Sequence, residues 1–425
     1  MKLSWFGRLA LALFASLALG LGMTACGGGT IAYLWVLGQQ YNQIAAFKVD
    51  DFTGNLTQAP HQPFSSQGSM PVMLVVKPGG GRFVYVLNQG LNGGPQLVPD
   101  STGKTTKAMA KGSGSGVAVF SVGGDGSLTY LQTYTSQGYV PQWMQLSSDG
   151  SYLYVLDKYA GAGTYDDCLA LNSKCPGSIT AFSIDSTTGR LTLVQNTQSV
   201  PPGSPAPTYF TVGIAPFQMK ATGTCLFTVN SQDQSITPYT FGTGGQLVTV
   251  TTGKITTSAA TISSINGNSS YLILTDSAAN TIIPYTVGSS CGLNIFNGGI
   301  QANATGTSNP TNSLISNNGK YLYILNQSTT NTTVTTPFSS ISGFLIDATK
   351  GLSPLTGSPY SVDSGPVCAV EDPTNKYLYI SDRNAGAVTG KIFDPNTGEL
   401  SQLSRGSTFS ATGLASCLAI SGSVD

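Results

Sequence analysis

The sequence predicts an all-β protein, a seven-bladed β-propeller of four-stranded antiparallel blades. Three observations predict it: one short apolar string occurs seven times, tight-turn sequences separate the strands around each copy, and 52 of the 425 residues are glycine. Four-stranded units of roughly 50 residues, repeated around a ring, are typical of propellers. A parallel β-solenoid would have a shorter repeat, and a pair of β-sandwiches would not repeat one strand seven times.

The recurring string lies at the centre of each unit. It is rich in aromatic and β-branched residues, and six of its seven copies end in Asn or Asp. This pattern predicts a buried strand closed by an Asx turn, so we expect the shared Asn or Asp to cap the turn that follows. The copies occupy residues 33–38, 83–88, 152–157, 225–230, 271–276, 321–326 and 377–382.

Most of the strings are preceded by one strand, and each is followed by two. A strand at residues 142–146 and the turn Ser148-Asp149-Gly150 lead into one copy, and an alternating strand at residues 179–184 follows it. The string is therefore strand b of an a–b–c–d meander.

The two ends of the repeat region predict how the ring closes. The first string begins at Tyr33 without a strand a before it, whereas residues 414–421 have the pattern of a lone strand a. We expect this last strand to pair with the N-terminal unit and complete its blade. Residues 31–422 are then one propeller domain.

The first 25 residues have the pattern of an export signal. Lys2 and Arg8 precede an apolar stretch at residues 9–23, which is too short for a membrane span. A small residue then precedes Cys26, as in bacterial lipoproteins, where this thiol carries the lipid. We expect a signal peptide (1–25), a lipidated Gly-rich tether (26–30) and a place in the cell envelope, on the periplasmic side or the surface. The alternative is an ordinary signal-peptidase site with an incidental cysteine.

The charge balance excludes some partners. Lys plus Arg and Asp plus Glu number 19 each, and only 9% of residues are charged, so nucleic acid is not expected as a partner. No Cys-x-x-Cys pair or histidine cluster marks a metal or redox centre. Asp157, Asp166 and Asp167 could offer oxygen ligands to Ca²⁺, but loop carboxylates are more often solvated. We expect no metal and no cofactor.

Disulfides are expected in an exported chain. Of seven cysteines, setting Cys26 aside leaves six. Two lie seven residues apart in a polar loop, two share one rung of strand a in neighbouring blades, and two lie at turns on the same face. The predicted pairs are Cys168–Cys175, Cys368–Cys417 and Cys225–Cys291; the alternative is small buried thiols.

The repeats resemble a known family. The Tyr-Leu-Tyr-Val-x-Asn strings and the Asp-x-x-Thr-Gly-x-Leu turns at residues 185–191 and 394–400 are similar to those of lactonase-type seven-bladed propellers, which include 6-phosphogluconolactonase-like and YVTN-repeat proteins. The resemblance implies a lactone-hydrolysing site of His, Glu and Arg at the starts of the inner strands.

The family's catalytic residues do not carry over to this chain. The starts of the inner strands contain no His, and the chain's single histidine, His61, lies in a Pro-flanked loop whose side chain we expect to be solvated. Glu371 ends an inner strand, on the face opposite the usual pocket. This leaves His61 and Arg383 as candidates for a catalytic role, and the sequence does not decide whether the protein is an enzyme.

The long loops after strand b offer a binding face. They follow Asn88, Asp157 and Asn326 and share one face of the ring, where rigid scaffolds commonly place binding residues. Tolerated insertions are the alternative. Ligand-binding candidates there, unique to their blades, are Trp143, Lys158, Tyr159 and Arg383. An aromatic and cationic set suits sugars or acidic small molecules.

Two functions therefore stay open. One is a lipid-anchored, non-catalytic module that binds a glycan, a peptide or an envelope protein, and touches the membrane through its lipid only. The other is a lactone-ring hydrolase with a rearranged site.

Replacing Cys26 by serine tests the predicted anchor. Without a thiol to acylate, C26S should take up no labelled palmitate and be recovered in the soluble fraction, whereas the wild type is labelled and fractionates with membranes. Recovery of C26S with membranes, together with an unlabelled wild type, would contradict the prediction.

Overall fold

The structure is a computed structural model that describes most of the chain. The described residues are 29–77, 81–99, 101–169, 174–198, 206–250, 253–327 and 338–422. The predicted signal peptide and Cys26, the predicted site of lipidation, lie outside these ranges. No helix within them is both long and apolar enough to serve as a membrane span.

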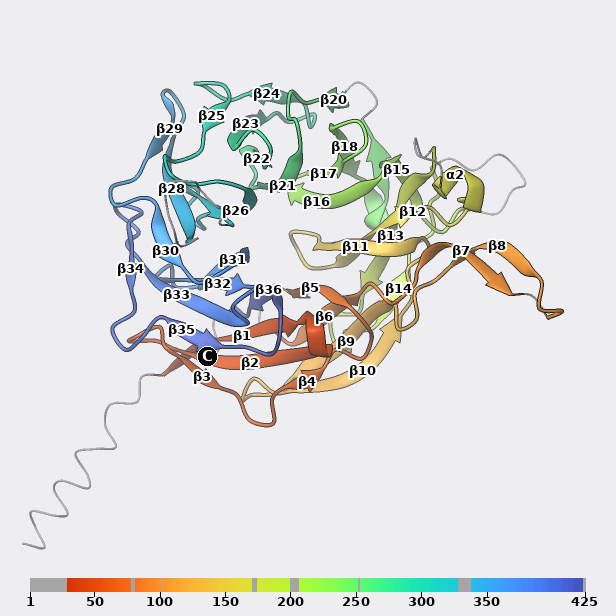
Figure 1. The fold of residues 1–425 in the computed structure, drawn as a ribbon, viewed down its shortest axis with the longest axis horizontal. Coiled ribbons are helices and arrows are strands. Elements are labelled where there is room, and N and C mark those ends of the chain that lie inside the picture. Colours follow the sequence, from red (N-terminus) through yellow and green to blue (C-terminus); the bar gives the residue numbers. More distant parts are fainter. Residues whose placement is uncertain are drawn as a thin grey trace, which may run out of the picture.

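The fold prediction is confirmed: seven antiparallel blades surround a central channel (Figure 1). Innermost in blades 1 to 7 is strand a: β36 (Ala415–Ile420), β5 (Pro71–Val76), β11 (Tyr139–Leu146), β16 (Pro216–Thr222), β21 (Ile262–Gly267), β26 (Pro310–Ile315) and β31 (Pro366–Glu371). The repeated string forms strand b: β1 (Thr30–Gly38), β6 (Phe83–Asn88), β12 (Tyr152–Tyr159), β17 (Cys225–Asn230), β22 (Tyr271–Asp276), β27 (Tyr321–Asn326) and β32 (Tyr377–Asp382).

The outer half of each blade is strand c and a strand d that is usually broken. Strand c is β2 (Gln43–Asp50), β9 (Gly116–Val122), β13 (Pro176–Ile184), β18 (Ser235–Phe241), β23 (Thr281–Val287), β28 (Ser339–Asp347) and β33 (Ala387–Phe393). Strand d is continuous in β10 (Leu128–Tyr134) and split elsewhere, into β3 (Leu56–Gln58) and β4 (Phe64–Ser65), β14 (Leu191–Leu193) and β15 (Phe210–Ile214), β19 (Leu247–Thr249) and β20 (Ile255–Thr256), β24 (Leu293–Ile295) and β25 (Gln301–Ala302), β29 (Gly351–Pro354) and β30 (Tyr360–Val362), and β34 (Leu400–Gln402) and β35 (Thr408–Ser410). Both pieces of a split strand pair with strand c.

The ring closes as predicted. The C-terminal β36 pairs antiparallel with β1, in a register that sets Val36 opposite Leu418. A disulfide between Cys368 and Cys417, whose Cα atoms are 5.2 Å apart, joins this strand to blade 7. The other two predicted pairs also form: Cys168–Cys175 and Cys225–Cys291.

Neighbouring blades meet through aromatic residues of strand b and a glycine of the next blade. The aromatic ring of the string's first residue packs on a glycine with a left-handed backbone in the c–d turn of the next blade. The side chain of the string's third residue donates a hydrogen bond to the carbonyl oxygen of that glycine. At the junction of blades 6 and 7, Tyr321 packs on Gly398 and the Tyr323 hydroxyl donates to the Gly398 oxygen at 2.6 Å. Five junctions have this contact; their glycines are Gly126, Gly189, Gly245, Gly398 and Gly54.

The junction of blades 4 and 5 replaces this contact by a disulfide. Its string begins with Cys225 instead of an aromatic residue, and the c–d turn of blade 5 presents Cys291 instead of a glycine. The Cys291 backbone has the same left-handed φ, 61°. The covalent bond therefore lies where five other junctions place an aromatic ring against a glycine.

The shared Asn or Asp at the end of strand b acts differently from the prediction. Among the described residues, Asp276 is the one that caps its own b–c turn, through the amides of Ala278 and Ala279. In other blades the side chain binds the incoming d–a connection or hydroxyls of strand c: Asp157 accepts from Ser136 Oγ and the Gly138 amide. The position is structural, as expected, but it is buried and mostly ties strand b to strand c or to the connection that enters the blade.

A glycine substitution tests the blade-to-blade contact. In Gly398→Ala the new Cβ would lie 2.4 Å from the Tyr321 ring, on a backbone with φ of 76°. Left-handed Ala costs about 1 kcal/mol and the displaced ring roughly 2 kcal/mol more. We expect the free energy of unfolding in denaturant to fall by about 3 kcal/mol.

Gly244→Ala is the matched control, since it has a φ of 70° and nothing within 4 Å of the new Cβ. It should cost only about 1 kcal/mol, the backbone part alone. Equal losses in the two variants would show that the ring contact contributes nothing.

Candidate functional site

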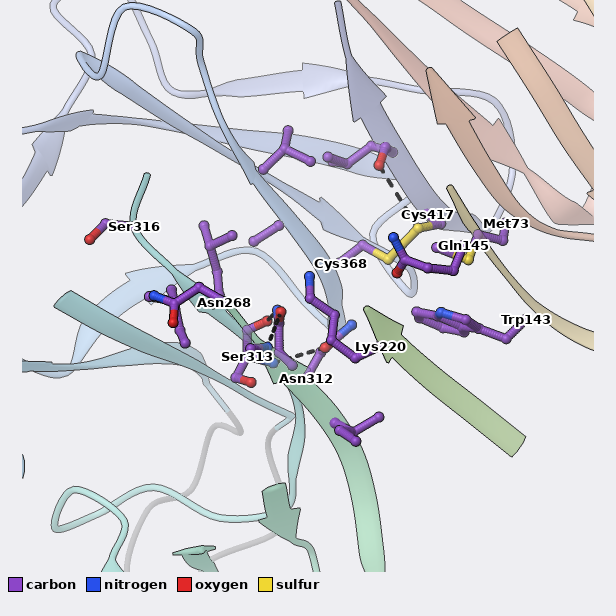
Figure 2. A pocket seen from close by; sticks show the side chains of 18 of the residues that line it. Met73, Trp143, Gln145, Lys220, Asn268, Asn312, Ser313, Ser316, Cys368 and Cys417 are labelled. Atoms are coloured by element: carbon purple, nitrogen blue, oxygen red, sulfur yellow. Dashed lines mark hydrogen bonds between the residues drawn. A yellow bond between two sulfur atoms is a disulfide. The ribbon is translucent and has the colours of Figure 1, made fainter. Parts of the chain in front are cut away.

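Strands a from all seven blades line one cavity in the central channel (Figure 2). Its volume is about 470 Å³, within the range of small-molecule sites. Trp143, Met73 and the Cys368–Cys417 disulfide form apolar parts of the wall. Gln145 and Lys220 contribute polar groups from blades 3 and 4.

A β-bulge near the start of strand a sets which residues line this cavity. In every blade the register shifts near the start of strand a, as between Pro141 and Trp143. A bulge turns the following side chain toward a new direction. A residue at this irregularity lines the cavity in five blades: Met73, Trp143, Asn312, Cys368 and Cys417.

Amide side chains connect neighbouring inner strands. Asn312 Nδ2 donates to the Val367 oxygen at 2.9 Å, from blade 6 to blade 7. The Asn266 amide likewise donates to the Ser313 oxygen, from blade 5 to blade 6. These groups are occupied by the protein itself, so they shape the wall and are not free to bind a ligand.

Three polar groups of residues that line the cavity have no hydrogen-bond partner among the described residues. The buried Trp143 Nε1 and Ser313 Oγ make no hydrogen bond. Lys220 forms no hydrogen bond or ion pair with any described residue. Burial without a nearby carboxylate lowers the pKa of its ammonium group to about 8. Trp143 Nε1 and Ser313 Oγ have almost no accessible surface, so the Lys220 ammonium group is the unpaired polar group that the cavity presents to a ligand.

Lys220 is the sole titratable side chain among the described residues that line the cavity. Glu371 lies nearby at the end of β31, and its Oε2 accepts from the amide of the lining residue Asn317 at 2.7 Å. Burial raises the pKa of Glu371 to about 7. It does not line the cavity, so no carboxylate there neutralises Lys220.

The structure separates the four predicted ligand-binding residues. Trp143 lies in the channel wall, whereas Lys158 and Tyr159 end β12, with Lys158 Nζ 5.2 Å from the centre of the Tyr159 ring. Arg383 follows β32 in blade 7, and its Nη2 donates to Gln39 Oε1 at 2.8 Å. These positions do not form one site.

His61, which the sequence left as a candidate for a catalytic role, lies at the outer edge of its blade, away from the channel. His61 is exposed in the loop between β3 and β4, at the outer edge of blade 1. The loop's place in the broken outer strand agrees with the expectation of a solvated side chain.

Two of the long loops pack against each other on blades 2 and 3. The hairpin of β7 (Gly94–Pro99) and β8 (Thr105–Ala110) projects from the ring toward α2 (Tyr165–Leu169) (Figure 1). Lys107 and Asp166 form an ion pair at 2.6 Å between them. The third long loop lies largely outside the described residues.

The carboxylates considered for Ca²⁺ are engaged elsewhere. Asp157 is buried, and burial raises its pKa to about 6. Asp166 pairs with Lys107, and Asp167 accepts from Thr164 Oγ1 at 2.6 Å. The part of the chain that the structure describes holds no group of three side chains suited to a metal ion.

Sequence reasoning missed Lys220. One signal could have found it: Lys220 and Glu371 are the charged residues that the seven strands a contain. A charge in a strand that is apolar or neutral in other blades needs a reason of its own.

Comparisons with known proteins agree with the predicted resemblance. The model of the family described as "Lactonase, 7-bladed beta-propeller" matches residues 101–213. No curated protein matches the sequence significantly. The fold is shared with a periplasmic gluconolactonase of Pseudomonas aeruginosa, at 14% identity and a TM-score of 0.63, over 92% of this chain and 99% of the other.

Two further solved structures are equally similar. A Lactobacillus plantarum protein has 14% identity and a TM-score of 0.64, covering 92% of this chain and 99% of its own. A Bacteroides fragilis protein, provisionally named a 6-phosphogluconolactonase, has 16% identity and a TM-score of 0.63, covering 92% and 98%. At these identities the likeness shows the fold alone. The chain is thus a seven-bladed propeller that resembles the lactonase-type family.

Lys220 should titrate about two units below an ordinary lysine, near pH 8. The neutral amine is the nucleophile in acetylation by acetic anhydride, so the rate at Lys220 should reach half its maximum near pH 8. Peptide mass spectrometry measures this rate at each pH. A half-maximal rate near pH 10 would contradict the absence of a neutralising partner.

Proposed function

We propose that the protein is an exported, lipid-anchored binding module whose central channel holds a small acidic, hydroxyl-rich ligand of the sugar-acid type. The observation that carries this is the unpaired Lys220 ammonium group in a cavity without a carboxylate. Lys220 is half-buried in a confined channel, where a cation without a counter-ion is destabilised and an anion stabilises it. A ligand carboxylate supplies that anion.

The groups around Lys220 support the same ligand class. The Lys220 ammonium group carries three N–H donors and no acceptor, and Trp143 lines the same cavity. The ammonium group favours a ligand rich in acceptors. The indole also offers an apolar face, on which sugar rings commonly pack.

The cavity supports binding better than hydrolysis. Opening a lactone needs a general base for water and a donor for the developing oxyanion. With a pKa of about 8, Lys220 is about nine-tenths protonated at pH 7. It can hold an anion in this form but cannot take a proton.

Export and anchoring are supported by two features. Three disulfides are typical of proteins that fold in an oxidising compartment outside the cytosol. The N-terminal sequence has a signal-peptide pattern that ends at Cys26. A tether of this kind would hold the propeller at a membrane surface in the cell envelope.

A second candidate is a lactone-ring hydrolase with a rearranged site. The lowered pKa of Lys220 favours it, because at pH 8 about half of the amines are neutral and could take a proton from water. The carboxylate product would then pair with the ammonium group.

Calorimetric titration tests the binding proposal. Gluconate and glucuronate should bind the mature domain, and uncharged glucose should bind at least tenfold more weakly, since it lacks the carboxylate. Lys220→Met should weaken gluconate binding by at least tenfold. Lys158→Met, at the end of β12, is the matched control and should leave binding unchanged.

The two candidates separate in the same preparation. Glucono-lactone should open no faster than in buffer if the channel only binds. Turnover that rises from pH 7 to pH 9 and disappears in Lys220→Met would establish the hydrolase instead. Loss of gluconate binding in Lys158→Met, with Lys220→Met unaffected, would move the site to the face of the b–c loops.

A further inference from the structure

Strand c of blade 7 departs from the other six blades at one buried position. Lys391 is the fifth residue of β33, and it lies opposite Leu378, the second residue of the repeated string on strand b. The residue in this register is aromatic in every other blade: Phe47, Phe120, Phe182, Tyr239, Tyr285 and Phe344. A lysine therefore stands where the fold otherwise uses a ring.

This lysine is buried and has no direct partner. Its side chain is 3% exposed, and it forms no hydrogen bond or ion pair with any described residue. The nearest carboxylate, Asp382, directs its Oδ2 to the Thr389 hydroxyl at 2.6 Å, and its Oδ1 has no partner. Asp382 therefore acts on the charge of the lysine from a distance but makes no ion pair with it.

A pocket of about 220 Å³ lies beside this lysine, between blades 6 and 7. Blade 6 contributes Ser361 and Asp363 at the end of β30, and blade 7 contributes Lys391, Gln402 and Thr408. The pocket lies beside the break between β34 and β35 in the outer strand. It is separate from the channel, whose lining shares none of these residues.

The chemistry of this pocket is balanced. One ammonium group, one carboxylate, an amide and hydroxyl groups offer both donors and acceptors, and the two charges offset each other. Such a set favours a neutral ligand with several hydroxyl groups over an anion or a cation. The volume lies below the roughly 300 Å³ at which drug-sized sites begin, so one ring fits.

We propose that this pocket is a second binding site, which takes a single neutral sugar residue with Lys391 and Asp363 as its main contacts. Lys391 donates to ring or hydroxyl oxygens, and Asp363 accepts from neighbouring hydroxyl groups. The residue can be a free monosaccharide or the end of a glycan, because both present the same groups.

Saturation-transfer NMR with glucose, galactose, mannose and a hexose trisaccharide tests the proposal. The wild type should bind at least one of them, and Lys391→Phe should abolish that binding, since it restores the ring of the other blades and fills the pocket. Asp363→Asn, which keeps the shape, should weaken binding at least tenfold. Binding of the trisaccharide alone identifies a glycan end, and binding of monosaccharides identifies a free sugar.

Controls keep this site distinct from the channel. Lys220→Met should leave neutral-sugar binding intact, and Lys391→Phe should leave gluconate binding intact. Absence of sugar binding by the wild type, or full binding by folded Lys391→Phe, would overturn the proposal. An unfolded Lys391→Phe protein would also contradict it, because it would show that the lysine is structural.

Discussion

The closed propeller depends on one contact, in which an aromatic side chain of strand b packs on a glycine of the next blade that has a left-handed backbone. It joins residues far apart in the sequence, as when Tyr379 of blade 7 donates to Gly54 of blade 1 at 2.6 Å. A side chain on that glycine would overlap the aromatic ring, so the aromatic residue requires a glycine at the facing position. Where blade 4 lacks the ring, the Cys225–Cys291 disulfide joins the same two elements.

This contact holds neighbouring blades together through strand b and the c–d turn, away from the channel. The side chains of the inner strands can therefore differ from blade to blade. Their backbones share one bulge, but the side chains beyond it range from Met73 to Trp143 and Asn312. Amide side chains join blade 5 to blade 6 and blade 6 to blade 7, and so stiffen one side of the channel. Against that rigid wall, Lys220 is an unpaired charge, and we assign it the anchoring of an acidic ligand.

The sequence predicted the features that repeat and missed those that occur once. Seven strings, turn glycines and the cysteine spacing were enough for the blades, the closure and all three disulfides. The bulge that turns Trp143 into the channel has no local mark, because it depends on pairing with strand b. The role of the shared Asn or Asp was also missed, since its partners, such as Ser136 for Asp157, lie in loops distant in sequence. Lys220 and Lys391 stand out only once the strands are aligned by their register.

A crystal structure of the mature domain soaked with gluconate tests the central claim most directly. The account predicts a carboxylate oxygen of gluconate about 3 Å from Lys220 Nζ, with the rest of the ligand beside Trp143 in the channel. A channel filled by water alone, with gluconate on the face of the b–c loops or absent at saturating concentration, would contradict it.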